Sequence, residues 1–137
     1  MTPRRVSSVK VPRARALGFS RVGEGFWEGA EVAREFGYPN AAGVLLVHAA
    51  IAYADAVSIH VNGVKSRGDD HLAAVGILKG LPGGDEALGS ALRHLEKVIE
   101  VKNRVSYEGE EFRSADLETL RKHSARFREW ARKRLKD

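Results

Sequence analysis

Three polar side chains follow one another near the end of a predicted helix, and a tyrosine comes shortly after them. Lys102, Asn103 and Arg104 are consecutive in the segment VKNRVSYEG, which also contains Tyr107. Cationic and amide side chains donate hydrogen bonds to phosphate oxygens, so this cluster is a candidate site for a nucleotide or RNA. The same residues also suit a helix end without any ligand, because cations are stabilised there and a tyrosine ring can pack with its hydroxyl in water.

A second group of polar residues lies on and after the most apolar stretch of the chain. His48 and Asp55 are about two helical turns apart and therefore share one side of a helix, and Asp69, Asp70 and His71 follow its end. These histidines and carboxylates are residue types that bind metals, but no helix carries two ligands at the i, i+4 spacing of H-E-x-x-H. We therefore predict no metal and no cofactor.

Two interpretations of this second group remain. The residues could line an interhelical pocket for a small ligand, or they could be hydrogen-bonded polar positions in a core or a dimer interface. Asp70 is better explained as a helix cap, and His71 as a first-turn residue packed on the central helix. We keep His48, Asp55, Asp70 and His71 as candidates for a pocket or an interface.

The stretch that must position both groups runs from Asn40 to Asn62. It is too long and too rich in alanine for a strand, and its apolar surface goes nearly all the way round a helix, which predicts burial on several sides. Its polar interruptions and the lack of flanking anchors argue against a membrane span. We predict a central helix capped by Asn40 and no contact with a membrane.

Apolar residues at helical spacing predict further helices on both sides. One starts near Gly23 and stops at Gly37 and Pro39, and a short one runs from Asp69 or Asp70 to Leu78. After the break LPGGD, Asp85 opens a helix that reaches residue 103 or 105, residues 108–111 form a loop, and Ser114 caps a final helix. No strand pattern competes. We predict an all-α, up-and-down four-helix bundle with an additional short helix between main helices 2 and 3.

Charge and composition divide the chain. Its 137 residues suit one domain, and the absence of cysteine and of an apolar signal-peptide core favours a cytoplasmic location. Residues 1–22 hold six Lys/Arg and no acid, residues 23–120 hold nine against sixteen acids, and residues 121–137 hold eight against two. We predict a basic, mobile arm over 1–21 and a bundle over 22–137. The basic ends could bind RNA or another polyanion, or they could lie against acidic faces of the protein.

The order of these segments resembles the HEPN (higher eukaryotes and prokaryotes nucleotide-binding) domains over about residues 22–136. FGYPNAAGVLLVHAAIAYADAV looks like the family's entry into its second helix, and KSRGDDHLAAVGIL like the segment leading into its short helix. VKNRVSYEG looks like the exit from the third helix, and Ala125 to Phe127 like the Ala-Arg-Phe step of the last one. The resemblance implies a dimeric helical domain.

HEPN ribonucleases carry an arginine, a polar residue and, four to six residues after the arginine, a histidine that assists metal-independent attack by the ribose 2′-hydroxyl. This chain has Lys102 at the arginine position, Asn103 at the polar position and Tyr107 where the histidine is expected. Lysine lacks the planar fork of arginine, and tyrosine is a poor general base near neutral pH. A tyrosine at this position is similar to the non-nuclease branch that accompanies small nucleotidyltransferases, so the motif is degenerate.

These observations favour one function and leave two alternatives. The first is a non-catalytic, dimeric HEPN-like module that binds a nucleotide, a nucleic acid or a protein partner, such as a nucleotidyltransferase, a toxin–antitoxin component or another product of an adjacent gene. The second is a metal-independent ribonuclease with a variant K-N-R-x-x-Y site. The third is a small-ligand-binding or purely structural dimeric bundle.

Overall fold

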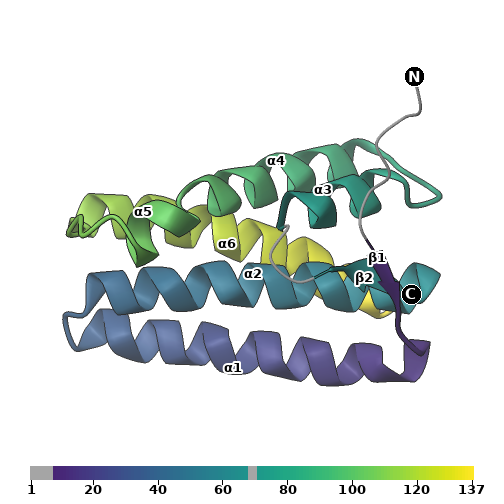
Figure 1. The fold of residues 1–137 in the computed structure, drawn as a ribbon, viewed down its shortest axis with the longest axis horizontal. Coiled ribbons are helices and arrows are strands. Elements are labelled where there is room, and N and C mark those ends of the chain that lie inside the picture. Colours follow the sequence, from purple (N-terminus) through teal and green to yellow (C-terminus); the bar gives the residue numbers. More distant parts are fainter. Residues whose placement is uncertain (1–7, 68–70) are drawn as a thin grey trace.

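The computed structural model describes residues 8–67 and 71–137, and this part of the chain is mostly helical (Figure 1). Its helices are α1 (Ala16–Glu35), α2 (Pro39–Asn62), α3 (His71–Lys79), α4 (Glu86–Glu100), α5 (Lys102–Ser106) and α6 (Ser114–Leu135). A short 3-10 helix, η1 (Arg13–Arg15), precedes α1, and two short strands, β1 (Ser8–Lys10) and β2 (Val64–Ser66), pair with each other. The prediction of an all-α fold class is confirmed.

Helix α2 is the core of the molecule, as its composition predicts. Every residue from Ala49 to Ile59 is buried, and α2 contacts all the other helices and β2. By length and hydropathy α2 could cross a membrane, but 83% of its most apolar window is covered by the rest of the chain. Packing within one chain therefore accounts for most of the apolar surface of α2, and the predicted burial on several sides is confirmed.

The ends of α2 follow from local backbone chemistry. Pro39 is the first helical residue, where a missing N–H costs no hydrogen bond, and Gly37 before it has a φ of 79°. At the other end Gly63 adopts the left-handed conformation, and its N–H bonds to the carbonyl of Ile59 at 2.9 Å. The predicted end of the central helix at Asn62 is confirmed.

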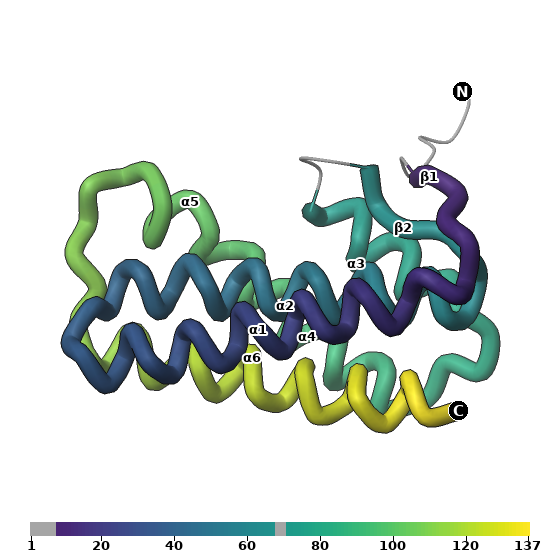
Figure 2. Tube along the Cα trace, turned by 90° about the horizontal axis from the view of Figure 1, so that it is seen from below, coloured from purple at the N-terminus to yellow at the C-terminus, as the bar shows by residue number. Residues whose placement is uncertain are grey.

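Helices α1, α2, α4 and α6 lie side by side, and α3 packs on α2 and α4 in the half of the assembly that holds β1 and β2 (Figures 1 and 2). Helix α6 packs on both α2 and α4, with Phe127 fully buried between them, while Leu95 and Val98 of α4 are also fully buried. Asp85 caps α4 by accepting a hydrogen bond from the N–H of Leu88 at 3.0 Å, as predicted.

The start of the chain differs from the prediction of a mobile arm over residues 1–21. Residues 8–10 form β1, which pairs antiparallel with β2, and α1 begins at Ala16 rather than near Gly23. Val11, Ala16 and Ile59 form a small apolar cluster that anchors this segment. The prediction was wrong for residues 8–21, and so was the absence of strands, because a few valines packed on α2 suffice to order a basic segment.

Three other local predictions were wrong. The central helix is capped at Tyr38, so Asn40 is free to serve another purpose, described below. Ser114 is the first residue of α6, and its cap is formed by Arg113, whose N–H bonds to Asp116 Oδ2 at 3.1 Å. The third main helix ends at Glu100 and not at residue 103 or 105. The predicted caps Asp69 and Asp70 lie outside the described residues.

Candidate functional site

The predicted cluster Lys102, Asn103 and Arg104 lies on the separate helix α5, because the chain bends at Val101 between α4 and α5. We call α5 together with Tyr107 the α5 corner. Asn103 is exposed, Lys102 is half-buried, and Tyr107 is 75% exposed. These three predicted residues are therefore accessible from solvent on a single short turn, as is part of the Arg104 side chain.

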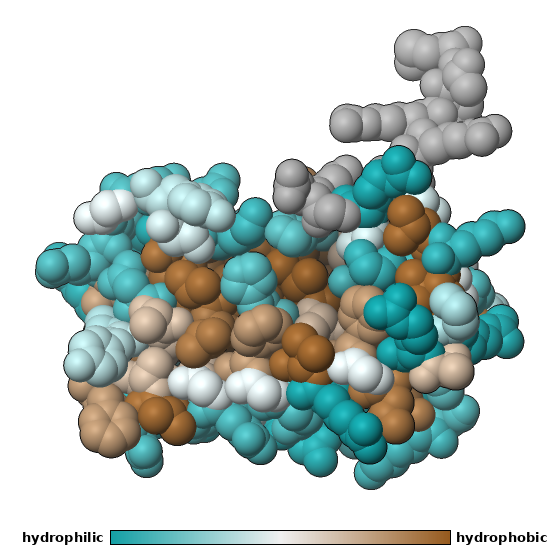
Figure 3. Space-filling model, turned by 60° about the horizontal axis from the view of Figure 1, so that its bottom comes forward, coloured by the Kyte–Doolittle hydropathy of each residue, from teal (hydrophilic) through white to brown (hydrophobic). Residues whose placement is uncertain are grey.

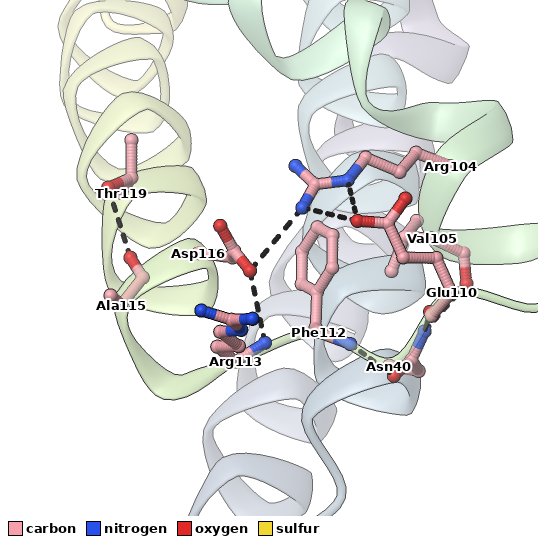
Figure 4. Close-up of polar contacts among 9 residues, drawn as sticks. All are labelled: Asn40, Arg104, Val105, Glu110, Phe112, Arg113, Ala115, Asp116 and Thr119. Carbon is pink, nitrogen blue, oxygen red and sulfur yellow. Dashed lines mark hydrogen bonds and ion pairs between the residues drawn. The ribbon is translucent and has the colours of Figure 1, made fainter.

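Arg104, the fourth residue, is engaged at the surface by two carboxylates (Figure 4). Its Nε donates to Glu110 Oε1 at 2.8 Å, and its Nη2 lies 2.7 Å from the same oxygen and 3.4 Å from Asp116 Oδ2. The guanidinium also lies over the ring of Phe112, 5.1 Å from its centroid. A phosphate would have to displace these partners, so Arg104 positions the loop between α5 and α6 rather than offering a free binding group.

Asn40 fixes the same loop from the start of α2. Its Nδ2 donates to the carbonyls of Glu110 at 2.8 Å and Val105 at 3.3 Å, and its Oδ1 accepts from the N–H of Phe112 at 2.9 Å. Gly43, one turn further along α2, is buried against Val105 and Phe112, and a Cβ there would come within 2.5 Å of Val105 Cγ2. The α5 corner is thus held on α2 by the hydrogen bonds of the Asn40 amide and by the close approach that Gly43 permits.

The residues proposed for a pocket do not converge. His48 is exposed and lies beside the ring of Phe26, with centroids 5.7 Å apart. Asp55 is 7% exposed, accepts a hydrogen bond from Ser66 Oγ at 3.1 Å and lies 4.0 Å from Lys65 Nζ, and its burial raises its pKa. Asp55 therefore fastens β2 to α2, which is a structural role.

The other two residues of this group give no metal site either. His71 is half-buried at the first position of α3, and Asp70 lies outside the described residues. Among residues 8–67 and 71–137, no group of three or more His, Asp or Glu side chains is placed to hold a metal ion.

The basic side chains of α6 that face α1 are paired with acids. Arg121 donates to Glu31 through two nitrogens at 2.6 and 3.1 Å, and Arg128 does the same to Glu24 at 3.1 and 2.8 Å. Trp27 lies between these guanidiniums, with 5.6 Å to Arg121 and 4.8 Å to Arg128 from its ring centroid. On the side of α6 that faces α1, the basic residues therefore lie against an acidic face of the protein, which was one of the two predicted alternatives.

A buried tyrosine hydroxyl joins the ion pair between Arg128 and Glu24. Tyr53 of α2 has no exposed surface, and its hydroxyl donates to Glu24 and accepts from Arg128 Nε at 3.1 Å. Burial raises the pKa of Glu24, but hydrogen bonds from Arg128 and Tyr53 together outweigh that effect and leave its pKa below the ordinary value. Burial also raises the pKa of Tyr53, as does its hydrogen bond to Glu24.

A histidine pair that the sequence analysis missed joins α4 to α6. His94 Nδ1 and His123 Nδ1 are 2.9 Å apart, both rings are half-buried, and their centroids are 5.2 Å apart. One ring must donate and the other accept, so the two carry opposite tautomers, and a single added proton is compatible with the bond. Each histidine precedes a buried residue of its helix, Leu95 or Ser124, but only the register between the helices brings the two rings together.

The surroundings of this pair are cationic. Burial lowers the pKa of His94, and His123, Arg126, Arg93 and Lys122 lower it further. Burial likewise lowers the pKa of His123, with added effects of Lys122 and Lys97 and an opposing effect of Glu100. The pair therefore stays neutral at a pH where an isolated histidine begins to take up a proton. An anion placed nearby would favour the protonated form and raise the pKa of the pair.

Comparison with family models, curated proteins and solved structures finds no match for this chain. The α5 corner and the surroundings of the histidine pair are the two candidate functional surfaces among the described residues.

Proposed function

We propose that this chain is a non-catalytic, dimeric module of the HEPN type, built as an up-and-down four-helix bundle, that docks a protein partner through the α5 corner. A nucleotidyltransferase or a toxin–antitoxin component is the class of partner that the resemblance implies. One observation carries the proposal: Arg104 is engaged by Glu110 and Asp116 while Tyr107 is 75% exposed. The corner therefore presents a docking surface instead of a free guanidinium.

Cleavage of RNA at this corner would need a cation on the phosphate and a base beside the 2′-hydroxyl. Lys102, at the position of the family's arginine, is half-buried and lacks the planar fork of a guanidinium, and Arg104 already has two carboxylate partners. Tyr107, at the position of the expected histidine, is a phenol exposed to solvent. An exposed tyrosine is instead a frequent anchor of protein interfaces, because its ring buries a large area with few rotatable bonds. This chemistry favours docking over bond cleavage.

The dimer is supported by an apolar band on the outer side of the α1–α2 hairpin (Figure 3). On α1, Val22 and Val32 are each 54% exposed and Phe36 is 72% exposed. On α2, the half-buried Leu45 continues the band. Val22 and Phe36 are about 21 Å apart along the helix axis at 1.5 Å per residue. A second copy is the occupant we propose, because an interface between identical chains places such a band against itself.

The dimer is tested by light scattering coupled to size exclusion, with wild type and Val32→Glu compared at the same concentration. We expect the wild type to have twice the mass of one chain and Val32→Glu to have the mass of a single chain. Leu72→Glu is the matched control, since Leu72 is 64% exposed on α3, away from the band, and should leave the dimer intact. A wild-type chain that stays monomeric at tens of micromolar excludes the dimer.

The α5 corner is tested by co-expression with the product of the adjacent gene, followed by co-purification. Tyr107→Ser should reduce the captured partner, whereas Tyr38→Ser, at a tyrosine that is 64% exposed on the α1–α2 turn, should not. The purified chain should also leave labelled RNA intact. Cleavage that disappears in both Lys102→Ala and Tyr107→Phe would establish the ribonuclease alternative in its place.

A further inference from the structure

The basic side chains of α6 fall into two sets with different surroundings. Those that face α1 have carboxylate partners, as described above. On the side facing α4, Lys122 and Arg126 have no ion pair within residues 8–67 and 71–137, and Lys133 has only Glu129 of its own helix, 3.8 Å away. Arg93 of α4 adds a further charge without an ion pair in the same described part of the chain. Positive charge therefore remains on one side of α6 only.

A hollow lies along this side, between α4 and α6. It has a volume of about 230 Å³ and is lined on α4 by Ser90 and His94 and on α6 by Arg126, Glu129, Trp130 and Lys133, so two cations face one carboxylate there. Trp130 also lines a second hollow of about 300 Å³ towards the end of α6, where Arg134 lies together with Asp85 and Asp137. The two hollows share Ala87 and Trp130, so they form one groove along the seam between the helices, with an indole at its middle.

We infer that this α4–α6 groove binds single-stranded nucleic acid, with Arg126 and Lys133 on the phosphates and Trp130 against a base. Guanidinium and ammonium groups hold phosphodiester oxygens, and stacking of bases on an aromatic side chain is the usual partner of such charges in single-strand binding. The seam from Lys122 to Lys133 is about 16 Å long at 1.5 Å per residue, which exceeds the length of one phosphate group. A polymer of phosphates fits this length better than a mononucleotide does.

The histidine pair supports the same ligand. His94 lines the groove, and its hydrogen bond to His123 holds the ring in place. Since the pair can take up one proton without losing this bond, a phosphate in the groove can be matched by an added positive charge. A duplex is disfavoured, because reading or clasping it requires an element that protrudes into a groove of the DNA, whereas this surface is itself hollow.

The inference does not depend on the proposed function, since the groove shares no residue with the α5 corner or with the apolar band. The experiment measures fluorescence anisotropy of labelled oligo(U), oligo(dT) and a mixed-sequence duplex with the full chain over a range of salt. We expect both single strands to bind more tightly than the duplex, and affinity to fall with salt with a log–log slope of about −1.4, the value for two neutralised phosphates.

Substitutions on α6 test whether the nucleic acid binds in the α4–α6 groove. Arg126→Gln and Lys133→Gln should each weaken oligo(U) binding by about fivefold or more and make the salt slope shallower by about 0.7. Arg132→Gln is the control, because Arg132 carries the same charge on the same helix but lies 3.9 Å from Glu24 on the α1 side. Equal weakening by Arg132→Gln, tighter binding of the duplex, or no binding of either single strand would overturn the assignment. Tyr107→Ser should leave oligo(U) binding unchanged, which separates this site from the α5 corner.

Discussion

Replacing Asn40 with alanine tests how the α5 corner is held on the bundle. The change removes two hydrogen bonds from Nδ2, to the carbonyls of Glu110 and Val105, and one to Oδ1 from the N–H of Phe112. A hydrogen bond contributes about 0.5–1.5 kcal/mol net. The bond to Val105 is long and that to Glu110 is exposed, so we expect a loss of about 2 kcal/mol in the free energy of unfolding rather than the full sum.

The assay is urea unfolding followed by circular dichroism, with hydrogen exchange of the amides in residues 105–112 as a local readout. The N–H of Phe112 is part-buried and loses its acceptor, so its exchange should accelerate more than that of residues in α4. Asn62→Ala is the matched control, because Asn62 is exposed at the other end of α2. If Asn40→Ala and Asn62→Ala differ by less than about 0.5 kcal/mol, the loop is not fastened by this amide.

Two further predictions concern the core and the histidine pair. Gly43→Ala should lower the free energy of unfolding measured in urea. Overpacking against Val105 costs about 1–3 kcal/mol, whereas the helix propensity of alanine contributes at most about 1 kcal/mol. Gly89→Ala is the control and should be neutral or stabilising, because its Cβ would meet only the flexible end of Arg93 at 3.7 Å. The midpoint of thermal unfolding should fall as pH drops below about 6.5, since the lowered pKa values of His94 and His123 mean that the unfolded chain takes up protons there before the folded chain does. An acid limb of the same size in His123→Gln would show that the pair is not its source.

The elements set by local chemistry could be predicted from the sequence. Gly63 ends α2 and Asp85 begins α4 because a left-handed turn and a cap each depend on a few adjacent residues. Asn40 has the same local signature as a cap, but its amide is engaged by a loop about seventy residues away in the chain. Competition of this kind between a local and a distant partner is decided only by packing.

The candidate site shows the same division. The exposure of Tyr107 could be expected of a residue that follows a helix, whereas the pairing of Arg104 with Glu110 and Asp116 depends on the path of the loop. The bond between His94 and His123 depends on the register of α4 against α6, which no spacing along the chain encodes. The alternation of Val9 and Val11 with polar residues was a usable strand signal, though a short one.

The pairing of β1 with β2 has a practical consequence for experiments on this protein. It brings the first described residues to the same end of the bundle as the last turn of α6, while α5 lies at the opposite end (Figure 1). His60 Nε2 lies 3.4 Å from the carbonyl oxygen of Asp137, which keeps the final residue beside the end of α2. A dye or a surface tether attached at the carboxyl terminus would therefore lie about one helix length from Tyr107. The protein can be immobilised through this terminus with the α5 corner still accessible to a partner in solution.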